Sequence, residues 1–251
     1  MRCGLQLYSV REEAARDLAG TIEHVGRLGL DGVELAGLHG HEAARVREWL
    51  DGAGLEVAGV HVGLDELEAD PRAPYRDAQA LAAGLLVVGW LPASLESAVT
   101  RSYVERLDRA SRAARDEGLR LAFHTHDAEL RAADDGSVLL DRLLADAPQL
   151  ELELDLGWAW IAGRDPGEVL TSLGPRCRIV HVKDFAHRGD RTSFTSVGEG
   201  TVPFEDALAG AAHVEWLVAE QDEGFVPDEL SAAARSAAGV LELRERLAGR
   251  S

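Results

Sequence analysis

The sequence predicts an α/β fold, a single (β/α)8 TIM barrel, and three observations support this prediction. The chain has 251 residues, and roughly 250 residues is the usual size of such a barrel. A short apolar or β-branched run, a turn and a segment of helical period recur along the whole length, as is typical of βα units on a parallel sheet. Because no linker, low-complexity tract or charge block interrupts this pattern, we expect one domain over residues 1–251.

Eight strands and the helices between them can be placed from this pattern. The predicted strands cover residues 3–8, 32–35, 56–62, 85–90, 120–124, 150–156, 178–183 and 215–220. Segments rich in Ala, Leu, Arg and Glu at helical spacing include residues 14–28, 42–53, 103–117 and 230–247. Gly29, Gly54 and Gly118 follow three of the helices, directly before a strand, where helices commonly end.

Eight βα units favour a closed barrel over an open, doubly wound sheet. No G-x-G-x-x-G and no G-x-x-x-x-G-K-[ST] motif follows the first predicted strand, which argues against a nucleotide-binding fold. Cys3 and Cys177 each begin an apolar run and lack a neighbouring cysteine, so we expect core thiols rather than a zinc cluster.

The composition excludes several classes of partner. With 26 Lys and Arg against 44 Asp and Glu, the net charge is −18, and a protein that binds nucleic acid needs cations to neutralise phosphates. No run reaches the roughly 18 to 20 apolar residues of a membrane span, and the first residues enter a strand without a signal-peptide core. We therefore expect a cytoplasmic protein that binds neither nucleic acid nor membrane.

Polar side chains gather at the carboxyl ends of the predicted strands. In a barrel of this kind, these ends form the mouth that carries catalytic groups. Members of a pair two residues apart point to the same side of a strand, so these side chains should converge on one mouth. From the first strand to the eighth they are Gln6 and Tyr8, Glu34, His61, Trp90, His124 and His126, Glu153 and Asp155, His181 and Lys183, and Glu220 and Asp222.

Four of these residues predict a metal site, because His124, Asp155, His181 and Glu220 follow four consecutive strands. Two imidazoles and two carboxylates suit one divalent ion such as Mn, Co, Zn, Fe or Mg, which would act as a Lewis acid on substrate oxygens. Taken singly, His124 is equally explained as a core histidine, Asp155 as a helix cap and Glu220 as a surface group.

Lys183, His61 and Glu220 are the predicted catalytic residues. Lys183 should lie beside the cation and act as an acid or base, although a salt bridge to Glu153 or Asp222 explains it equally well. His61 suits a proton shuttle or a hydrogen bond to a substrate hydroxyl. Glu34 is a candidate to bind a sugar diol or to act as a base, although a place in a polar network at the rim is favoured for it.

Aromatic side chains near the strand ends are expected to bind substrate. Tyr8, Trp90 and Trp158 follow strands one, four and six, where their rings can stack on the apolar face of a sugar; packing in the core is the alternative. His126 is expected to contact substrate or to orient His124. Glu129, in the loop after strand five, is expected to be solvated, and the long segment 186–199 is expected to close over the site.

The strand-end motifs resemble those of the xylose-isomerase-like TIM barrels, the sugar phosphate isomerase/epimerase superfamily. This superfamily includes ketose 3-epimerases, hydroxypyruvate isomerase, inosose dehydratase and, more distantly, endonuclease IV. The resemblance covers nearly the whole chain in the right order. It rests on GLQLYSVR at residues 4–11, GVELAG at 32–37, HVGL at 61–64, FHTHD at 123–127, ELDLGW at 153–158, HVKD at 181–184, VGEG at 197–200 and AEQDE at 219–223.

The resemblance implies one divalent ion held at the ends of strands five to eight, which corresponds to the four residues named above. Ketose 3-epimerases have a glutamate where this chain has His124, and they use it with the last-strand glutamate as an acid/base pair. Histidine at this position is similar to the inosose dehydratase branch. The two-glutamate mechanism therefore does not carry over to this chain.

The function expected from the sequence is a metal-dependent isomerase or epimerase that acts on a small sugar or keto-polyol by proton transfer through an enediolate. A dehydratase-type lyase on an inosose-like keto-polyol, with the same metal site, is the alternative. An endonuclease-IV-like DNA repair enzyme is disfavoured by the acidic charge, and a metal-binding sensor or carbohydrate-binding module stays open. The oligomeric state is open too, a homo-oligomer included.

Overall fold

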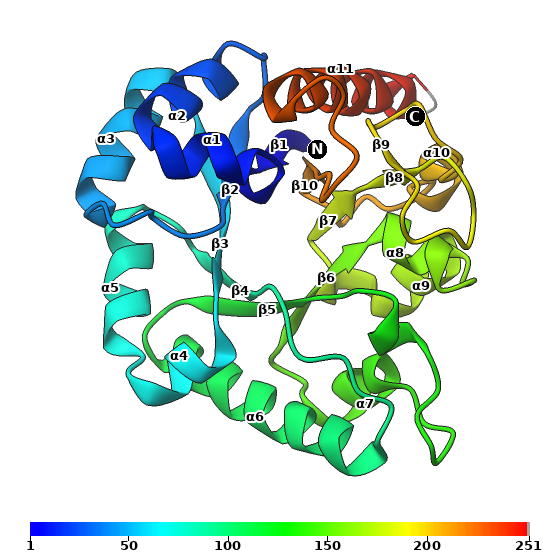
Figure 1. Cartoon of the computed structure of the whole chain (residues 1–251). Helices are drawn as coiled ribbons and strands as arrows, with labels where there is room; N and C mark the ends of the chain where they lie inside the picture. Colours follow the sequence, from blue (N-terminus) through cyan, green and yellow to red (C-terminus); the bar gives the residue numbers. More distant parts are fainter. Residues whose placement is uncertain (250–251) are drawn as a thin grey trace.

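The computed structural model describes residues 1–249 and contains a closed barrel of parallel strands (Figure 1). The barrel strands are β1 (Arg2–Gln6), β2 (Gly32–Leu35), β3 (Glu56–Val62), β4 (Leu85–Val88), β5 (Arg120–His124), β6 (Glu151–Asp155), β7 (Ile179–Val182) and β10 (Trp216–Ala219). Each strand pairs with the barrel strand before it in the chain, and β10 closes the barrel on β1. The predicted TIM barrel is therefore confirmed.

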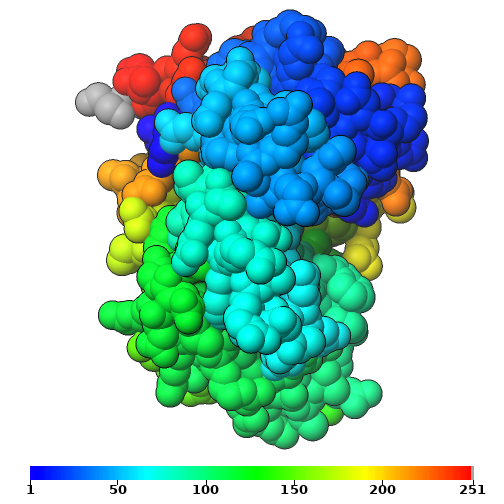
Figure 2. All heavy atoms as spheres, turned by 90° about the vertical axis from the view of Figure 1, so that its left-hand side faces the viewer, coloured from blue at the N-terminus to red at the C-terminus, as the bar shows by residue number. Residues whose placement is uncertain are grey.

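Helices surround the strands as an outer ring (Figure 1). They are α1 (Arg11–Arg16), α2 (Leu18–Gly26), α3 (Ala43–Ala53), α4 (Leu64–Ala69), α5 (Arg72–Ala80), α6 (Ser97–Asp116), α7 (Leu139–Asp146), α8 (Leu156–Ile161), α9 (Pro166–Leu173), α10 (Phe204–Ala207) and α11 (Glu229–Ala248), with short 3-10 turns at Leu7–Val10, Ala128–Leu130 and Gly174–Arg176. Figure 2 shows α3 to α5, in light blue and cyan, covering one side. Within residues 1–249, no helix has the length and apolar character needed to cross a membrane.

Some element ends differ from the sequence prediction, and local side-chain bonds explain two of them. The first strand ends at Gln6 rather than at Tyr8, because the Gln6 side chain accepts the Tyr8 N–H at 3.1 Å and turns the chain into a 3-10 helix. The helix predicted over residues 14–28 is broken at Asp17, whose carboxylate caps α2 through the N–H of Gly20. The fourth strand ends at Val88, two residues before Trp90.

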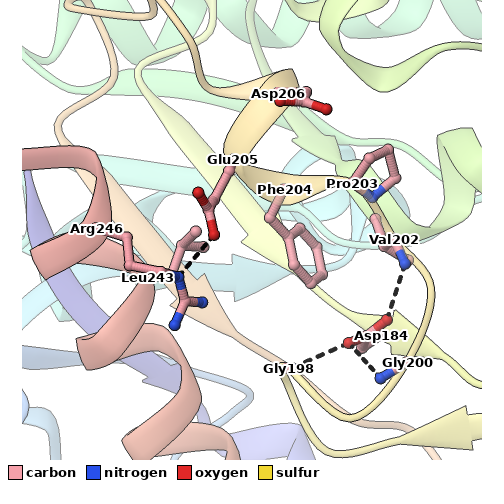
Figure 3. A pocket seen from close by; sticks show the side chains of 10 residues that line it. All are labelled: Asp184, Gly198, Gly200, Val202, Pro203, Phe204, Glu205, Asp206, Leu243 and Arg246. Carbon is pink, nitrogen blue, oxygen red and sulfur yellow. Dashed lines mark hydrogen bonds and ion pairs between the residues drawn. The ribbon is translucent and has the colours of Figure 1, made fainter. Parts of the chain in front are cut away.

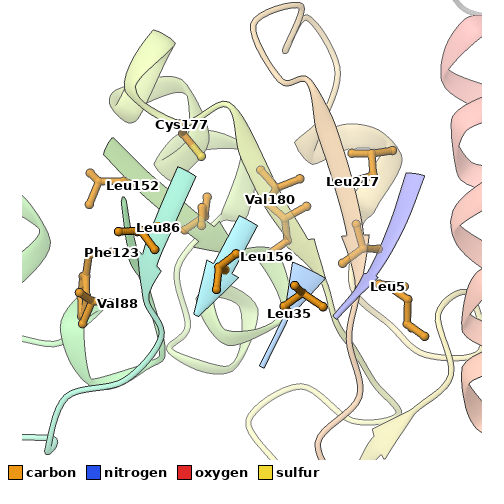
Figure 4. Close-up of a cluster of buried hydrophobic side chains, with 14 of the residues drawn as sticks. Leu5, Leu35, Leu86, Val88, Phe123, Leu152, Leu156, Cys177, Val180 and Leu217 are labelled. Atoms are coloured by element: carbon orange, nitrogen blue, oxygen red, sulfur yellow. The ribbon is translucent and has the colours of Figure 1, made fainter. Parts of the chain in front are cut away.

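The apolar core has two layers, one on each side of the strands. Side chains that point outward from the strands pack against the helices, and Figure 4 labels Leu5, Leu35, Phe123 and Leu217 among them. The barrel interior holds a smaller cluster, made of Ala58, Leu85, Val87, Ala122, Ile179, Trp216 and Val218. Its Trp216 ring fits because β2 has Gly32 beside it, where a Cβ would lie 2.8 Å from the indole.

Cys3 and Cys177 are buried, free thiols of this core, as the sequence predicted. Burial raises the pKa of Cys3 to about 11 and that of Cys177 to about 12. Both therefore stay protonated near neutral pH and behave as small apolar side chains.

A register shift between β2 and β3, at Val33/Glu34, changes which residues of β3 face the interior. Ala58 belongs to the interior cluster, yet His61, three residues later, lines the cavity at the mouth. Strict alternation would have turned one of the two outward. The irregularity thus allows β3 to contribute both to the core and to the site.

The segment after β7 is anchored by one buried carboxylate (Figure 3). Asp184 begins β8 (Asp184–Phe185), which pairs with β9 (Phe194–Thr195), and it accepts the backbone N–H groups of Phe185, Gly198, Gly200 and Val202 at 2.9 to 3.2 Å. Gly200 is required there, because a Cβ would lie 2.2 Å from the Asp184 Oδ1. A cavity of about 350 Å³ adjoins this anchor, and no predicted site residue lines it.

Replacing Asp184 by Ala should lower the free energy of unfolding by about 3 kcal/mol, because buried N–H groups lose their only carboxylate acceptor. Urea denaturation measures the change. Asp141→Ala, at an exposed position of α7, is the control and should change stability by less than about 0.5 kcal/mol. Equal losses in the two variants would show that the anchor does not stabilise the fold.

Candidate active site

The predicted metal ligands converge at the carboxyl end of the barrel. One donor atom from each of His124, Asp155, His181 and Glu220 lies within 4.8 Å of the others, and all four side chains are buried. Each comes from the end of β5, β6, β7 or β10. Four strands that are adjacent in the barrel thus bring together residues up to 96 positions apart.

His124 is held in the form that a metal ligand requires. Its Nδ1 lies 2.8 Å from Glu153 Oε1, which leaves Nε2 on the side of Asp155, 3.9 Å from Oδ2. Burial, together with the nearby imidazoles of His181 and His126, lowers the pKa of His124 well below its usual value. The ring is therefore neutral, and a donated hydrogen bond from Nδ1 directs the Nε2 lone pair into the cluster.

His181 is clamped between carboxylates on both sides of its ring. Nδ1 lies 2.7 Å from Glu220 Oε2, and Nε2 lies 2.7 Å from Glu34 Oε2 and 2.9 Å from Glu153 Oε1. Burial alone would lower the pKa of His181, but Glu153, Glu220 and Glu34 outweigh it and raise this pKa well above its usual value. Glu34 and Glu153 thus fix the ring so that Nδ1 points at the cluster.

Asp155 uses its two carboxylate oxygens differently. Its Oδ1 accepts the Trp158 N–H at 2.8 Å and caps α8, so the helix-cap interpretation holds for this oxygen. Its Oδ2 is buried without a well-aligned hydrogen-bond donor, and burial raises the pKa of Asp155 to about 6. This oxygen faces the Lys183 Nζ at 3.1 Å, and together with the neutral imidazole of His124 it makes a set of ligand atoms that fits a divalent ion.

Lys183 directs its ammonium group into the same carboxylates. Its Nζ lies 2.8 Å from Glu220, 2.8 Å from Asp222 and 3.1 Å from Asp155, while no ion pair with Glu153 is found among the described residues. These carboxylates outweigh burial and raise the pKa of Lys183 well above its usual value, so the group is charged. Of the two salt bridges considered from the sequence, the one to Asp222 forms.

The sequence contained a stronger signal for Lys183 than its place after a strand. It is the only lysine in the chain, since 25 of the 26 basic residues are arginine. Arginine stays protonated under all ordinary conditions, whereas lysine can exchange a proton when its surroundings change. A single lysine placed among buried carboxylates therefore indicates a position that requires an amine.

Glu34 lies deeper than a residue that touches substrate. It is fully buried, and its Oε2 accepts a hydrogen bond from Gln6 Nε2 at 2.7 Å in addition to facing His181. Glu34 does not line the cavity, so its surroundings agree with the place in a polar network that the sequence favoured, and its contact with a sugar diol stays a prediction. A Cβ at Gly59 would lie 2.6 Å from the Glu34 Oε1, so this glycine makes room for the carboxylate.

His61 connects the buried network to the cavity. Its Nε2 lies 3.1 Å from Glu34 Oε2 and 3.4 Å from Glu153 Oε1, and the ring also lines the cavity. Burial opposes protonation, but Glu34 and Glu153 raise the pKa of His61 to about 10. Gly89 is needed beside it, because a Cβ there would lie 2.2 Å from the His61 Nδ1.

A cavity of about 650 Å³ opens above this cluster. Its walls are formed by Tyr8, Ala36, Gly37, His61, Val62, Gly63, Glu66, Gly89, Trp90, His124, His126, Glu220 and Asp222. Tyr8 and Trp90 therefore reach the cavity as expected for substrate-binding residues. His126 lines it too, and burial lowers its pKa to about 3, so its imidazole is neutral.

Trp158 has a different place from the one expected. It is 6% exposed, is absent from the cavity wall and packs edge-on against Phe185 and Phe194. It approaches the site through Lys183, whose Nζ lies 5.4 Å from the ring centroid. The alternative of core packing explains Trp158 better than stacking on a sugar.

Glu129 was missed as a supporting residue. It is buried rather than solvated, and its Oε2 accepts the His126 N–H at 2.7 Å, which holds the chain just after β5. The segment 186–199 reaches the same loop, because Arg191 forms an ion pair with Asp127 at 3.2 Å. No periodicity in the loop could have revealed either contact.

Comparison with known proteins identifies relatives of this barrel. The sequence profile of the xylose isomerase-like TIM barrels matches residues 22–241. An inosose dehydratase of Geobacillus kaustophilus (strain HTA426) is 28% identical over 143 residues, which cover 49% of this chain and 45% of that protein. The chain thus aligns with less than half the length of this curated relative.

Solved structures share the architecture along nearly the whole chain. A sugar phosphate isomerase/epimerase from Parabacteroides distasonis ATCC 8503 has a TM-score of 0.81 at 18% identity, covering 96% of this chain and 98% of that one. D-allulose 3-epimerase from Methylomonas sp. has a TM-score of 0.72 at 16% identity, with coverages of 97% and 98%. At these identities the likeness establishes the fold.

Asp155→Asn and Glu220→Gln each remove one negative ligand at nearly constant side-chain volume. We expect each to weaken Mn²⁺ or Zn²⁺ binding by about 100-fold or more, measured by calorimetry and by metal content after dialysis. Glu66→Gln, which alters another carboxylate of the cavity wall, should leave metal binding unchanged. Full metal retention in both ligand variants would refute the ligand assignment.

Proposed function

Because the chain belongs to the xylose isomerase-like TIM-barrel family, we propose that it is a divalent-metal-dependent isomerase or epimerase of a small keto-sugar or keto-polyol. The observation that carries this proposal is the cluster of His124, Asp155, His181 and Glu220 at the floor of a cavity lined by further acid/base groups. Isomerisation and epimerisation both begin with removal of a proton next to a carbonyl. The site therefore needs a base, an acid and a stabiliser of negative charge.

The stabiliser is the divalent ion that these four residues would hold, which supplies Lewis-acid stabilisation of negative charge on the substrate oxygens. The ligand side chains are preorganised by neighbouring residues. Glu153 orients His124, Glu34 and Glu153 orient His181, and Asp155 Oδ2 lies 3.9 Å from His124 Nε2. Such preorganised partners reduce the rearrangement that binding requires.

Glu220 is proposed as the base that accepts the α-proton of the substrate. Burial alone would raise its pKa, but Lys183 and His181 outweigh burial and hold the pKa of Glu220 well below its usual value. It is therefore a carboxylate near neutral pH. His61 and His126 face the same cavity, where the imidazole of His61 is charged and that of His126 is neutral.

Lys183 is proposed as the acid that hydrogen-bonds or protonates the developing enediolate oxygen. Its ammonium group is 1% exposed and lies beside Glu220, so it reaches an oxygen next to the carbon that Glu220 deprotonates. Asp222, which lies on the cavity wall, holds the ammonium group of Lys183 through an ion pair at 2.8 Å. Acid and base thus act on adjacent atoms of one substrate.

A dehydratase acting on a keto-polyol is the second candidate, and one observation favours it. His124 occupies the place of one of the two glutamates on which ketose 3-epimerases depend, and the curated relative at 28% identity is an inosose dehydratase. Elimination of water uses the same first deprotonation. The two candidates differ in whether the next proton returns to carbon or goes to a leaving hydroxyl.

Incubation in D₂O with metal and a panel of ketoses and inososes separates these outcomes. An isomerase or epimerase incorporates deuterium at carbon without loss of water, whereas a dehydratase gives a product lighter by one water; mass spectrometry and NMR measure both. The metal-deficient variant Asp155→Asn is the control. Absence of exchange and of dehydration across the panel would refute both candidates.

The variants Lys183→Gln and Lys183→Arg test whether Lys183 is the acid. Each should lower kcat by about 10²-fold to 10⁴-fold, because glutamine has no proton to give and arginine does not release its own. Metal content and melting temperature, measured in parallel, show whether the site remains assembled. A near-normal kcat in Lys183→Arg would mean that only the positive charge is needed and that Lys183 is not the acid.

A further inference from the structure

The active-site cavity extends well beyond the metal-ligand cluster. The four ligands follow β5, β6, β7 and β10, yet much of the cavity wall follows β2, β3 and β4, which provide no ligand of that cluster. This second part of the wall consists of Ala36, Gly37, Val62, Gly63, Glu66, Gly89 and Trp90. We call this region the outer lobe.

The outer lobe has small residues along its floor. Gly37, Gly63 and Gly89 expose backbone to the cavity, and a Cβ at Gly37 would meet no atom within 4 Å. Ala36 and Val62 add only short side chains. These short side chains therefore leave room for a ligand group beside the metal cluster, outside the space where the proposed reaction takes place.

Two exposed aromatic rings stand at the ends of this lobe. Trp90 follows β4 and is 65% exposed, and Tyr8 follows β1 and is 45% exposed, so they flank the ends of β2 and β3. The guanidinium of Arg11 lies 4.5 Å from the centroid of the Tyr8 ring and braces it. Large apolar rings left in water on both sides of a cavity are typical of a surface that binds a ligand.

The charge of the cavity wall indicates what kind of ligand it accepts. Glu66, Glu220 and Asp222 are the carboxylates of the wall, and of the described residues that form the outer lobe the one with a charged side chain is Glu66. The lysine nearby, Lys183, is already paired with three carboxylates. The described residues of the outer lobe therefore offer no cation to an anionic group such as a phosphate, whereas an uncharged ring needs none.

The volume is large for a single sugar ring. Ligand pockets of roughly 300 to 1,000 Å³ hold molecules of drug size, and this cavity of about 650 Å³ lies in the middle of that range. One ring bound over the metal cluster would leave the outer lobe and its two aromatic side chains without a partner.

The geometry points to a second subsite over the ends of β2 to β4, in which an uncharged ring joined to the reacting keto-sugar stacks on Trp90, while Tyr8 bounds the other end of the lobe. The ring is the apolar face of a second sugar or an aryl group, since both present the same surface to an indole. The inference rests on the proposed function only for the ring that reacts. The substrate class is then a neutral glycoside of a keto-sugar rather than a free or phosphorylated monosaccharide.

Calorimetry on the protein supplied with Mn²⁺ tests this subsite. The affinity for D-fructose is compared with that for isomaltulose, which is the same ketose carrying a second sugar. The affinity for methyl β-D-glucopyranoside is compared with that for phenyl β-D-glucopyranoside, which carries an aryl group. At least one two-ring ligand should bind about fivefold to tenfold more tightly than its one-ring partner, which is the usual gain from aromatic stacking. Whichever pair shows the gain identifies the source of the ring.

Trp90→Ala should reduce the ratio between two-ring and one-ring affinities to about one. Trp49→Ala, a tryptophan on α3 that packs against His41 and is absent from the cavity wall, is the matched control and should keep the gain. Equal affinities for one-ring and two-ring ligands in the unaltered protein would overturn the subsite. So would tighter binding of fructose 6-phosphate than of isomaltulose, which would indicate an anion site.

The two proposals fail independently. A two-ring gain without any turnover in D₂O would leave the subsite standing and refute the reaction. Turnover of one-ring ketoses without a two-ring gain would leave the reaction standing and refute the subsite.

Discussion

The clamp on His181 is the interaction on which the rest of the site depends. One imidazole lies within 2.9 Å of carboxylate oxygens from Glu34, Glu153 and Glu220, which come from three different strands. Burying that many carboxylates is costly unless each is paired, and removing one partner would leave an uncompensated charge in the barrel. The acidic residues are therefore tolerated at the mouth because the histidines and the single lysine are interleaved with them.

This pairing arranges the mouth in two levels. Glu153 lies two residues before Asp155 on β6 and faces the same side, so Glu34 and Glu153 form a lower level that holds the rings of His124 and His181. The upper level presents the remaining donor atoms to the cavity. Because Glu34 and Glu153 hold the two imidazoles, the positions of the reactive groups are set by short strands rather than by flexible loops.

The sequence predicted the barrel and the four-residue cluster well, because period-two alternation at the ends of parallel strands determines which side chains meet. The sequence could not predict how far below the cavity each of these side chains lies. Glu34 is at a strand end like the others, but Gly59 lets its carboxylate sink beneath the cavity. Trp158 and Glu129 lie after strands, where three-dimensional packing rather than alternation sets direction. That Lys183 is the only lysine could be read from the sequence, and this fact indicates a role for the amine more strongly than its position after a strand does.

That solitary lysine also has a chemical consequence. Its ε-amine is 1% exposed and surrounded by carboxylates, so reagents that acylate lysine find no ε-amine on the surface of the folded protein. Modification of Lys183 therefore requires the mouth of the barrel to open. The rate at which the ε-amine of Lys183 is acylated therefore measures opening motions at the site, and arginine side chains do not compete for the reagent.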